Sequence, residues 1–297
     1  MQPVHNKIQK MATFSRIQKY ALVGFGAFSG IALYYLNYSQ SSPPIVHNSW
    51  TTAYEPPEHS KWDLNWDHRE PEALFKPLKN ATHSPEAENK INEQIEKYKA
   101  KFTRHIFLIR HGQYNLEGKT DQERALTELG KKQAAYTGQR LKELDLPITE
   151  IVRSTMTRAQ ETGSIIIKTL NLSGVPVFDC PLIEEGAPIP PEPGVGHWKP
   201  EKYQFYQDGA RIEAAFRKYF YRAPASQEKD TYTVLVCHAN VIRYFVCRAL
   251  QFPPEAWLRL SLNHASITWI SITPNGHVIL RQLGDSGHMP VDSISRR

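Results

Sequence analysis

Apolar runs of strand length alternate with segments of helical composition from residue 105 to the end of the sequence. The predicted strands are 105–109, 151–152, 231–237, and a hairpin of 267–272 and 278–280 that turns at Pro274-Asn275-Gly276. The predicted helices are 127–144, capped by Thr127, 156–170, and a segment that ends near residues 252–254. This alternation predicts an α/β three-layer sandwich with a mostly parallel central sheet.

An uncharged and mostly apolar stretch occupies residues 20–38, and its length matches that of a bilayer-spanning helix. Tyr34, Tyr35 and Tyr38 lie at one end, where aromatic rings favour the membrane interface, and basic residues precede the other end. We predict a transmembrane anchor over 20–38. A cleaved secretory signal is the alternative, but the basic, acid-free region 1–19 favours mitochondrial targeting.

Residues 39–85 are predicted to form a linker, because Pro, Ser and Thr are frequent near its start. Within it, Trp62 and Trp66 each precede an aspartate, and exposed tryptophans are costly unless they are buried somewhere. Physical arguments leave two placements open: docking on the chain's own catalytic domain, or insertion into a neighbouring subunit. Residues 86–101 have helix-forming composition, which predicts a lead-in helix within 86–104, ahead of a catalytic domain over 105–297.

The net charge of +6 does not indicate a nucleic-acid partner. Four of these charges lie in residues 1–54, which contain no Asp or Glu, so the rest of the chain is nearly balanced. The cysteines Cys180, Cys237 and Cys247 have neither the spacing of metal ligands nor an even count. We therefore predict no disulfide framework and no zinc site.

Two predicted strands end in histidine, as Arg110-His111-Gly112 and as Cys237-His238, and a third strand end leads to Arg158. One strand-end histidine alone is more often structural than catalytic, but the combination has a chemical meaning. Imidazole supplies a nucleophile, guanidinium groups clamp phosphate, and a helix start favours an anion. Because the carboxyl ends of parallel strands share one edge of a sheet, the sequence predicts a site for phosphoryl transfer there.

These segments carry a resemblance to a known superfamily over residues 105 to about 285. The motifs are Arg110-His111-Gly112 with Gln113 and Asn115, Leu126-Thr127-x-x-Gly130, Ser154-x-x-x-Arg158-Ala159-x-x-Thr162, and the late His238. In this order they resemble the histidine phosphatase, or phosphoglycerate mutase-like, superfamily. The resemblance implies a phosphoglycerate mutase-like fold and a reaction that passes through a phosphohistidine, without a metal or other cofactor.

The resemblance also implies roles for individual residues. His111 would attack phosphorus, while Arg110, Arg158 and His238 would hold the phosphoryl oxygens. A carboxylate would protonate the leaving oxygen, because an alkoxide is too basic to leave unaided. We assign this acid to Glu185, with Glu184 as the alternative. The residues expected to bind substrate are Gln113, Asn115 and Asn240.

Several segments are similar to mitochondrial serine/threonine-protein phosphatases within that superfamily, among them 62–67, 185–189, 208–213 and 237–244. The likeness implies phosphoprotein substrates and a place in the inner mitochondrial membrane, with the catalytic domain in the intermembrane space. It also implies a homo-oligomer assembled through insertion into a neighbouring subunit of Trp62, Asp63, Asn65, Trp66 and Asp67. A small-molecule phosphatase or mutase and an oligomeric membrane scaffold are the alternative functions.

Overall fold

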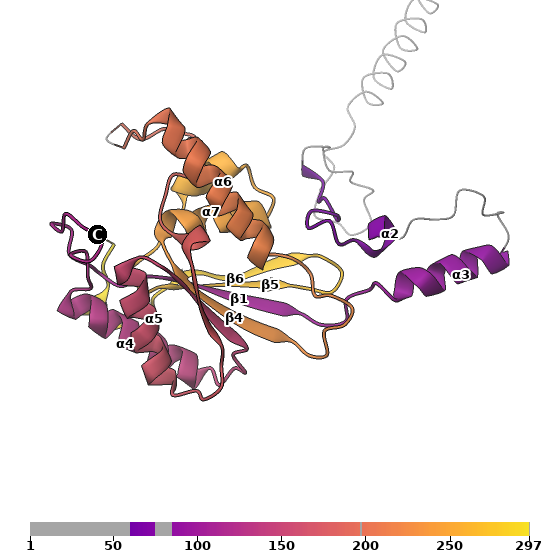
Figure 1. The fold of residues 1–297 in the computed structure, drawn as a ribbon, viewed down its shortest axis with the longest axis horizontal. Helices are drawn as coiled ribbons and strands as arrows, with labels where there is room; N and C mark the ends of the chain where they lie inside the picture. The colour runs from indigo at the N-terminus through magenta and orange to yellow at the C-terminus, as the bar shows by residue number, and fades with distance from the viewer. Residues whose placement is uncertain (1–59, 75–84, 197, 297) are drawn as a thin grey trace, which may run out of the picture. The chain divides into compact units, whose positions relative to one another are not determined.

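A six-stranded mixed sheet forms the centre of the catalytic region in the computed structural model, which describes residues 60–74, 85–196 and 198–296 (Figure 1). The strands are β1 (Arg104–Arg110), β2 (Glu150–Ser154), β3 (Val177–Cys180), β4 (Thr231–Cys237), β5 (Ile267–Ile272) and β6 (Val278–Asp285), in the spatial order β3-β2-β4-β1-β5-β6. The first four strands pair in parallel, whereas β5 runs antiparallel to β1 and β6 antiparallel to β5. The predicted mostly parallel sheet is therefore mixed: the short turn between β5 and β6 permits only antiparallel pairing of these two strands, and β5 is also antiparallel to β1.

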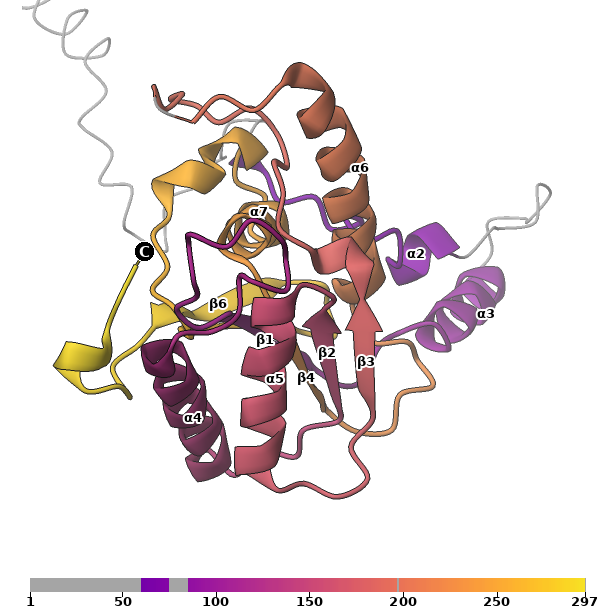
Figure 2. The same ribbon diagram turned by 60° about the vertical axis from the view of Figure 1, so that its left-hand side comes forward.

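Helices cover both faces of this sheet (Figures 1 and 2). The long helices are α4 (Glu128–Glu143), α5 (Thr157–Leu170), α6 (Lys202–Tyr219) and α7 (Ala239–Ala249), and the shorter elements are α2 (Pro71–Leu74), α3 (Pro85–Glu96), η2 (Pro181–Ile183), η3 (Pro254–Arg259) and η4 (Val291–Ser293). In β1, Ile106 and Leu108 pack in one apolar core with α6 and α7, and Phe107 and Ile109 in another with α4 and α5. Each strand residue thus faces the opposite side from its neighbours.

The predicted strands and helices of the core are present. The apolar pattern does not predict two further elements, strand β3 and helix α6. Strand β3 is short and exposes three of its four side chains, so it lacks the buried run that marks β1 and β4. Helix α6 buries Ile212, Ala215, Phe216 and Tyr219 at helical spacing, but Tyr203 and Tyr206 are exposed, and these aromatic residues obscure the apolar stripe in the sequence. Helix α3 ends at Glu96, five residues before the predicted end.

The two N-terminal segments predicted as a targeting region and a membrane anchor lie outside the described residues, as does the linker up to residue 59. In the part of the chain that the structure describes, no helix has the length and apolar character needed to cross a membrane.

The predicted active-site residues lie at one edge of the sheet, where the parallel strands have their carboxyl ends. Arg110 at the end of β1 is level with Cys237 at the end of β4, and Arg153 near the end of β2 is level with Val236. Because β5 is antiparallel, it begins at the same edge, where Ile267 pairs with Ile109. The segments that follow β1, β2 and β4 therefore meet the segment that precedes β5.

The two-tryptophan segment 62–67 packs at the opposite edge, on the chain's own catalytic region. The indole Nε1 of Trp66 donates to the carbonyl oxygen of Gly276 at 2.8 Å, and its ring lies 6.2 Å from that of Phe216. Gln251 forms hydrogen bonds with both backbone polar groups of Asp63, at 2.8 and 2.9 Å. Of the two placements left open by physical arguments, the single chain shows docking on its own domain. The predicted insertion into a neighbouring subunit stays a prediction.

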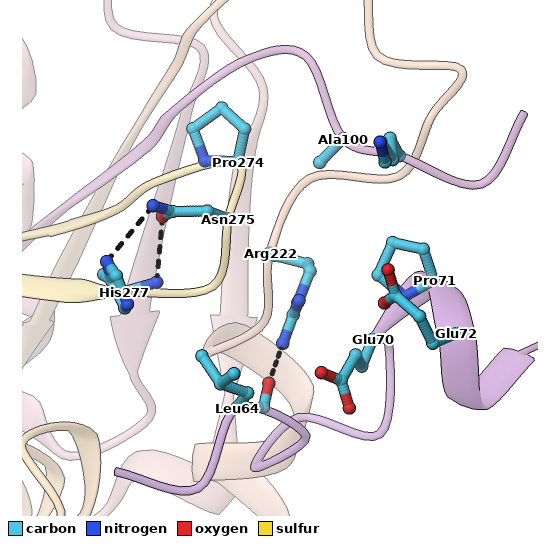
Figure 3. Close-up of a pocket in the computed structure, with 10 residues that line it drawn as sticks. Leu64, Glu70, Pro71, Glu72, Ala100, Arg222, Pro274, Asn275 and His277 are labelled. Carbon is cyan, nitrogen blue, oxygen red and sulfur yellow. Dashed lines mark hydrogen bonds between the residues drawn. The ribbon is translucent and has the colours of Figure 1, made fainter. Parts of the chain in front are cut away.

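A buried ion pair holds this segment in place. Nε and Nη2 of Arg222 donate to the Asp67 carboxylate at 3.0–3.1 Å, the Arg222 backbone N–H donates at 2.8 Å, and the two side chains are 4% and 0% exposed. Arg222 also donates to the carbonyl of Leu64, on the wall of a cavity of about 560 Å³ that Pro274 and His277 line as well (Figure 3). Each charge depends on the other, because a single buried charge is strongly disfavoured.

We expect Asp67→Leu to lower the free energy of unfolding by about 3–5 kcal/mol, because it leaves Arg222 buried and unpaired. The double variant Asp67→Leu/Arg222→Met should recover most of that loss, since it removes both charges. Urea unfolding of the full chain measures both values. As a control, Glu96→Ala breaks an exposed ion pair of 2.7 Å with Lys99 and should cost less than about 1 kcal/mol. A double variant no more stable than Asp67→Leu would contradict this account.

Candidate active site

His111 follows β1 directly and is almost fully buried, with 2% of its surface exposed. Its backbone N–H donates to the carbonyl of Cys237 at 3.0 Å, and its carbonyl accepts from the N–H of Ala265 at 3.1 Å. The ring Nδ1 lies 2.8 Å from the carbonyl oxygen of Gly112, which can only accept, so Nδ1 carries the proton. Nε2 consequently holds the lone pair of a neutral imidazole.

The charge state of His111 favours nucleophilic attack. Burial, followed by the neighbouring His238, Arg110 and Arg158, lowers the pKa of His111 well below the usual 6.5. The imidazole is therefore neutral at physiological pH, and its Nε2 lone pair is available to an electrophile.

Gly112 allows the close approach of α4 to the turn that follows His111. A Cβ atom on Gly112 would lie 2.5 Å from the backbone oxygen of Gly130, which rules out a larger residue at this position. The Gly112 N–H donates to Oγ1 of Thr162 at 3.0 Å, and this hydroxyl donates to the carbonyl of Arg158 at 2.7 Å. Thr127 accepts from the Gly130 N–H at 3.0 Å and caps α4, as predicted. The sequence motifs that contain Gly112, Gly130 and Thr162 are thus in contact at the turn after β1.

His238 follows β4 and is fully buried beside His111, with ring centroids 5.1 Å apart. Its Nε2 lies 2.8 Å from Oγ of Ser154, at the end of β2, while its Nδ1 has no partner among the described residues. Burial, followed by Arg158, lowers the pKa of His238 well below 6.5. A second neutral imidazole therefore stands next to the nucleophile.

Arg110 is oriented by the backbone around it. Its Nη1 donates to the carbonyl oxygens of Leu262 at 2.7 Å and Arg296 at 3.0 Å, while its buried Nε has no partner in the described part of the chain. Burial lowers the pKa of Arg110 to about 10, so the group stays charged at neutral pH. The guanidinium is thus held through Nη1, and its Nε–H is unused.

Arg158, in the first turn of α5, is the second buried cation, with 4% of its surface exposed. Its guanidinium lies 4.7 Å from the ring centre of Tyr114 and 3.7 Å from Oδ1 of Asp121. Nε and Nη1 of Arg158 have no hydrogen-bond partner within the described residues. Buried cations with unused donors beside a nucleophile are the arrangement that a phosphoryl group requires.

The two candidate acids differ in position. Glu185 lines a cavity of about 570 Å³ together with Arg158 and Asn240, and its Oε1 lies 3.3 Å from the backbone nitrogen of Asn240. Burial raises the pKa of Glu185 above the usual 4.5, against the lowering effect of Arg158. The carboxylate of Glu184 instead accepts from the Thr155 hydroxyl, and Glu184 does not line this cavity. The geometry favours Glu185 as the proton donor.

The predicted substrate-binding residues do not all come together. Asn240 lines the cavity, and its Nδ2 donates to the carbonyl of Gly186 at 3.0 Å. Oε1 of Gln113 accepts from the Thr127 hydroxyl at 2.8 Å, and Nδ2 of Asn115 donates to the carbonyl of Glu123 at 3.0 Å. Gln113 and Asn115 thus brace the loop after His111 instead of lining the cavity. The segment 62–67 lies at the other edge of the sheet.

Sequence reasoning missed two rings that surround the nucleophile. Tyr114 lies edge-on to His111 with centroids 5.0 Å apart, and the buried His264 lies 5.7 Å away. His264 could have been found, because it precedes the predicted strand 267–272, which must start at the active edge if it is antiparallel. In the described ranges, no group of three His, Cys, Asp or Glu residues is placed to hold a metal ion.

Comparison with known proteins identifies the family of the chain. The sequence profile of the histidine phosphatase superfamily (branch 1) matches residues 106–186 and 194–283. The chain is 54% identical over 273 residues to the serine/threonine-protein phosphatase Pgam5, mitochondrial, of Drosophila erecta, covering 92% of this chain and 94% of the relative. It is 52% identical over 282 residues to the protein of the same name from Drosophila pseudoobscura pseudoobscura, covering 95% and 97%.

Among solved structures, a phosphoglycerate mutase from Plasmodium falciparum is 34% identical, with a TM-score of 0.46, and the match covers 66% of this chain and 99% of that one. The profile match includes the segments that carry His111, Arg158 and His238. The sequence identity extends over nearly the whole chain and nearly the whole of the Drosophila relatives. The chain belongs to the histidine phosphatase superfamily.

Proposed function

We propose that this chain is a serine/threonine-protein phosphatase that hydrolyses phosphoserine and phosphothreonine through a phosphohistidine at His111. The observation that carries the proposal is the neutral, buried His111, which lies beside the unused guanidinium donors of Arg110 and Arg158 and beside His238, whose Nδ1 has no partner among the described residues. The curated relatives that share more than half of their residues with the chain bear the name of such a phosphatase. An anion is the ligand that these donors fit.

In the first half of the reaction, Nε2 of His111 attacks phosphorus. The P–N bond forms as the P–O bond to the substrate breaks, and the departing serine or threonine oxygen takes a proton from Glu185. Arg110 and Arg158 stabilise the charge on the phosphoryl oxygens, and His238 donates a hydrogen bond. The Gly112 carbonyl keeps its bond to Nδ1–H and offsets the positive charge that the ring acquires.

In the second half, water attacks the phosphohistidine. Glu185, now ionised, takes a proton from the water as the new P–O bond forms. The P–N bond breaks, its electron pair returns to Nε2 of His111, and inorganic phosphate leaves. The raised pKa of Glu185 suits a carboxyl group that both gives and takes a proton.

The three residues predicted to bind substrate differ in whether they can contact it directly. Asn240 lines the cavity and can contact the peptide directly. Gln113 and Asn115 would first have to leave their loop partners Thr127 and Glu123. We therefore expect substitution of Asn240 to act on substrate affinity, and substitution of the other two to act through the loop.

We further propose that residues 20–38 anchor the chain in the inner mitochondrial membrane, with the catalytic domain in the intermembrane space. The support is the uncharged apolar run behind a basic region, and the word "mitochondrial" in the relatives' names.

We propose a homo-oligomer in which segment 62–67 docks on a neighbouring copy. The contacts of Asp67 and Trp66 with Arg222 and Gly276 can be made by the segment of either copy, as in domain exchange.

We expect His111→Ala to lower the turnover of a phosphoserine peptide by about a thousand-fold or more, because the nucleophile is lost. Mass spectrometry of the full chain, quenched quickly without acid, should show one phosphoryl group on His111 in the wild type and none in the variant. The exposed His277→Ala serves as a control with normal turnover. Turnover that persists in His111→Ala would overturn the proposed chemistry, and cleavage of phosphoglycerates but not phosphopeptides would indicate a metabolite enzyme.

We expect Glu185→Gln to lower kcat for a phosphoserine peptide by about a hundred-fold, because an alkoxide needs a proton to leave. The same variant should lose far less with an aryl phosphate, whose leaving group is weakly basic. Glu184→Gln is the matched control and should behave like the wild type with both substrates. An equal loss with both substrates in Glu185→Gln would argue against a role as general acid.

We expect the anchor and the two-tryptophan segment to act independently. Deletion of residues 20–38 should release the chain from mitochondrial membranes into the carbonate-soluble fraction without changing the number of subunits in the oligomer. Trp62→Ala should lower the native mass without releasing the chain. Protease protection in mitoplasts tests the side of the membrane. Retention of the deleted form on membranes, or an unchanged mass for Trp62→Ala, would refute the corresponding proposal.

A further inference from the structure

A third buried imidazole, His264, lies beside the nucleophile and has no part in the mechanism above. Only 1% of its surface is exposed, and its ring centroid is 5.7 Å from His111 and 6.5 Å from Tyr114. Its Nδ1 lies 2.9 Å from Oγ of Ser295, while its buried Nε2 has no partner among the described residues. A buried polar atom without a partner is costly, so an unpartnered Nε2 on a ring this close to His111 requires a reason.

The hydrogen bonds around Gln133 have only one possible direction. Gln133 is fully buried, and its Oε1 accepts from the backbone N–H of Gln113 at 2.8 Å. This bond fixes the orientation of the amide, because a backbone N–H can only donate. Nε2 of Gln133 therefore donates to the carbonyl of Ser293 at 2.7 Å and to Oγ of Ser295 at 2.9 Å.

Ser295 links Gln133 to His264. Oγ of Ser295 accepts from Gln133, and Nδ1 of His264 lies 2.9 Å away, so the hydroxyl proton can be donated to Nδ1. If Ser295 donates to Nδ1, the proton of the neutral ring is on Nε2, and every member of the chain is satisfied except that last N–H. Burial, followed by Arg110, lowers the pKa of His264 to about 3, so the ring is neutral at physiological pH.

We propose that His264 is a further catalytic residue whose Nε2–H donates to a phosphoryl oxygen held at His111, and that Gln133 and Ser295 are positioning residues that set this tautomer. The inference rests on the proposed phosphatase function and adds to it a donor beyond Arg110, Arg158 and His238. The other tautomer would turn a lone pair towards an anionic oxygen and repel it. The relay thus decides whether this wall of the site attracts or repels phosphate.

The first test replaces His264 in the full chain. His264→Leu should lower kcat/KM for a phosphoserine peptide about ten-fold and weaken inhibition by orthovanadate by a similar factor, since one donor to the anion is lost. His264→Gln keeps an N–H at the end of a side chain of similar length and should recover activity to within about three-fold of the wild type. Thermal melting confirms that each variant is folded.

The second test asks whether Ser295 positions His264 by setting its tautomer or only stabilises the fold. Ser295→Ala removes the hydroxyl that fixes the tautomer, so it should lower kcat/KM about five-fold in the wild-type background. In the His264→Gln background it should have no further effect, because an amide needs no tautomer to be set. Ser271→Ala is the matched control: Oγ of Ser271 lies 2.8 Å from Nδ1 of a buried ring, His105, away from the site, and its loss should leave activity unchanged.

The outcomes are distinguishable from those of the proposed function. Failure of the wild type to turn over any phosphopeptide would refute the phosphatase function, while the orthovanadate constants of the variants would still decide the role of His264. Unchanged orthovanadate inhibition in a folded His264→Leu would overturn the inference. If His264→Leu does not fold, equal losses from Ser295→Ala in both backgrounds would overturn it instead.

Discussion

Two guanidinium groups buried beside one imidazole are the constraint on which the rest of the site depends. Nε of Arg110 and Nε of Arg158 have no hydrogen-bond partner in the described part of the chain, and the Asp121 carboxylate that faces Arg158 is 3.7 Å away. Burying such charges without full pairing costs several kcal/mol for each. The apolar cores on the two faces of the sheet offset that cost, and an anion that enters the site relieves it.

The same charges set the protonation of the histidines. Arg110 and Arg158 both contribute to lowering the pKa of His111 and of His238, after burial, so the field that attracts phosphate also keeps the nucleophile neutral. Attraction of the substrate and readiness of the nucleophile therefore have one origin. A site with buried neutral histidines and no cations nearby would keep the lone pair but lose the pull on the phosphoryl group.

The sequence predicts those parts of the site that lie on short, continuous segments. His111, His238 and Arg158 follow strands whose apolar runs are easy to recognise, and shared strand ends bring them together. The network of Gln133, Ser295 and His264 escapes such reasoning. Gln133 lies more than 100 residues before the other two in the sequence, and the three meet only in the folded chain. Strand β3 escapes for a different reason, since three of its four side chains are exposed, and the stripe of α6 is obscured by the exposed aromatic residues Tyr203 and Tyr206.

The placement of segment 62–67 is a case where physical arguments could not choose and the folded chain shows one answer. The decisive partners, Arg222 and Gly276, belong to a loop and a turn at the edge opposite the active site, and no local pattern identifies them as a receptor. Burial of Asp67 makes the docking selective, since a neutral substitute would leave Arg222 uncompensated.

The choice of donors around His111 also affects product release. Arg110 and Arg158 are charged, but His238 and His264 are neutral rings whose hydrogen bonds depend on direction more than on net charge. A site lined by further cations would hold inorganic phosphate about as tightly as the transition state, and uniform binding of that kind does not raise turnover. Neutral donors fixed in orientation can favour the geometry of the transferring phosphoryl group without retaining the product to the same degree. This argument gives a physical reason for a relay that sets a tautomer where another arginine would have supplied more attraction.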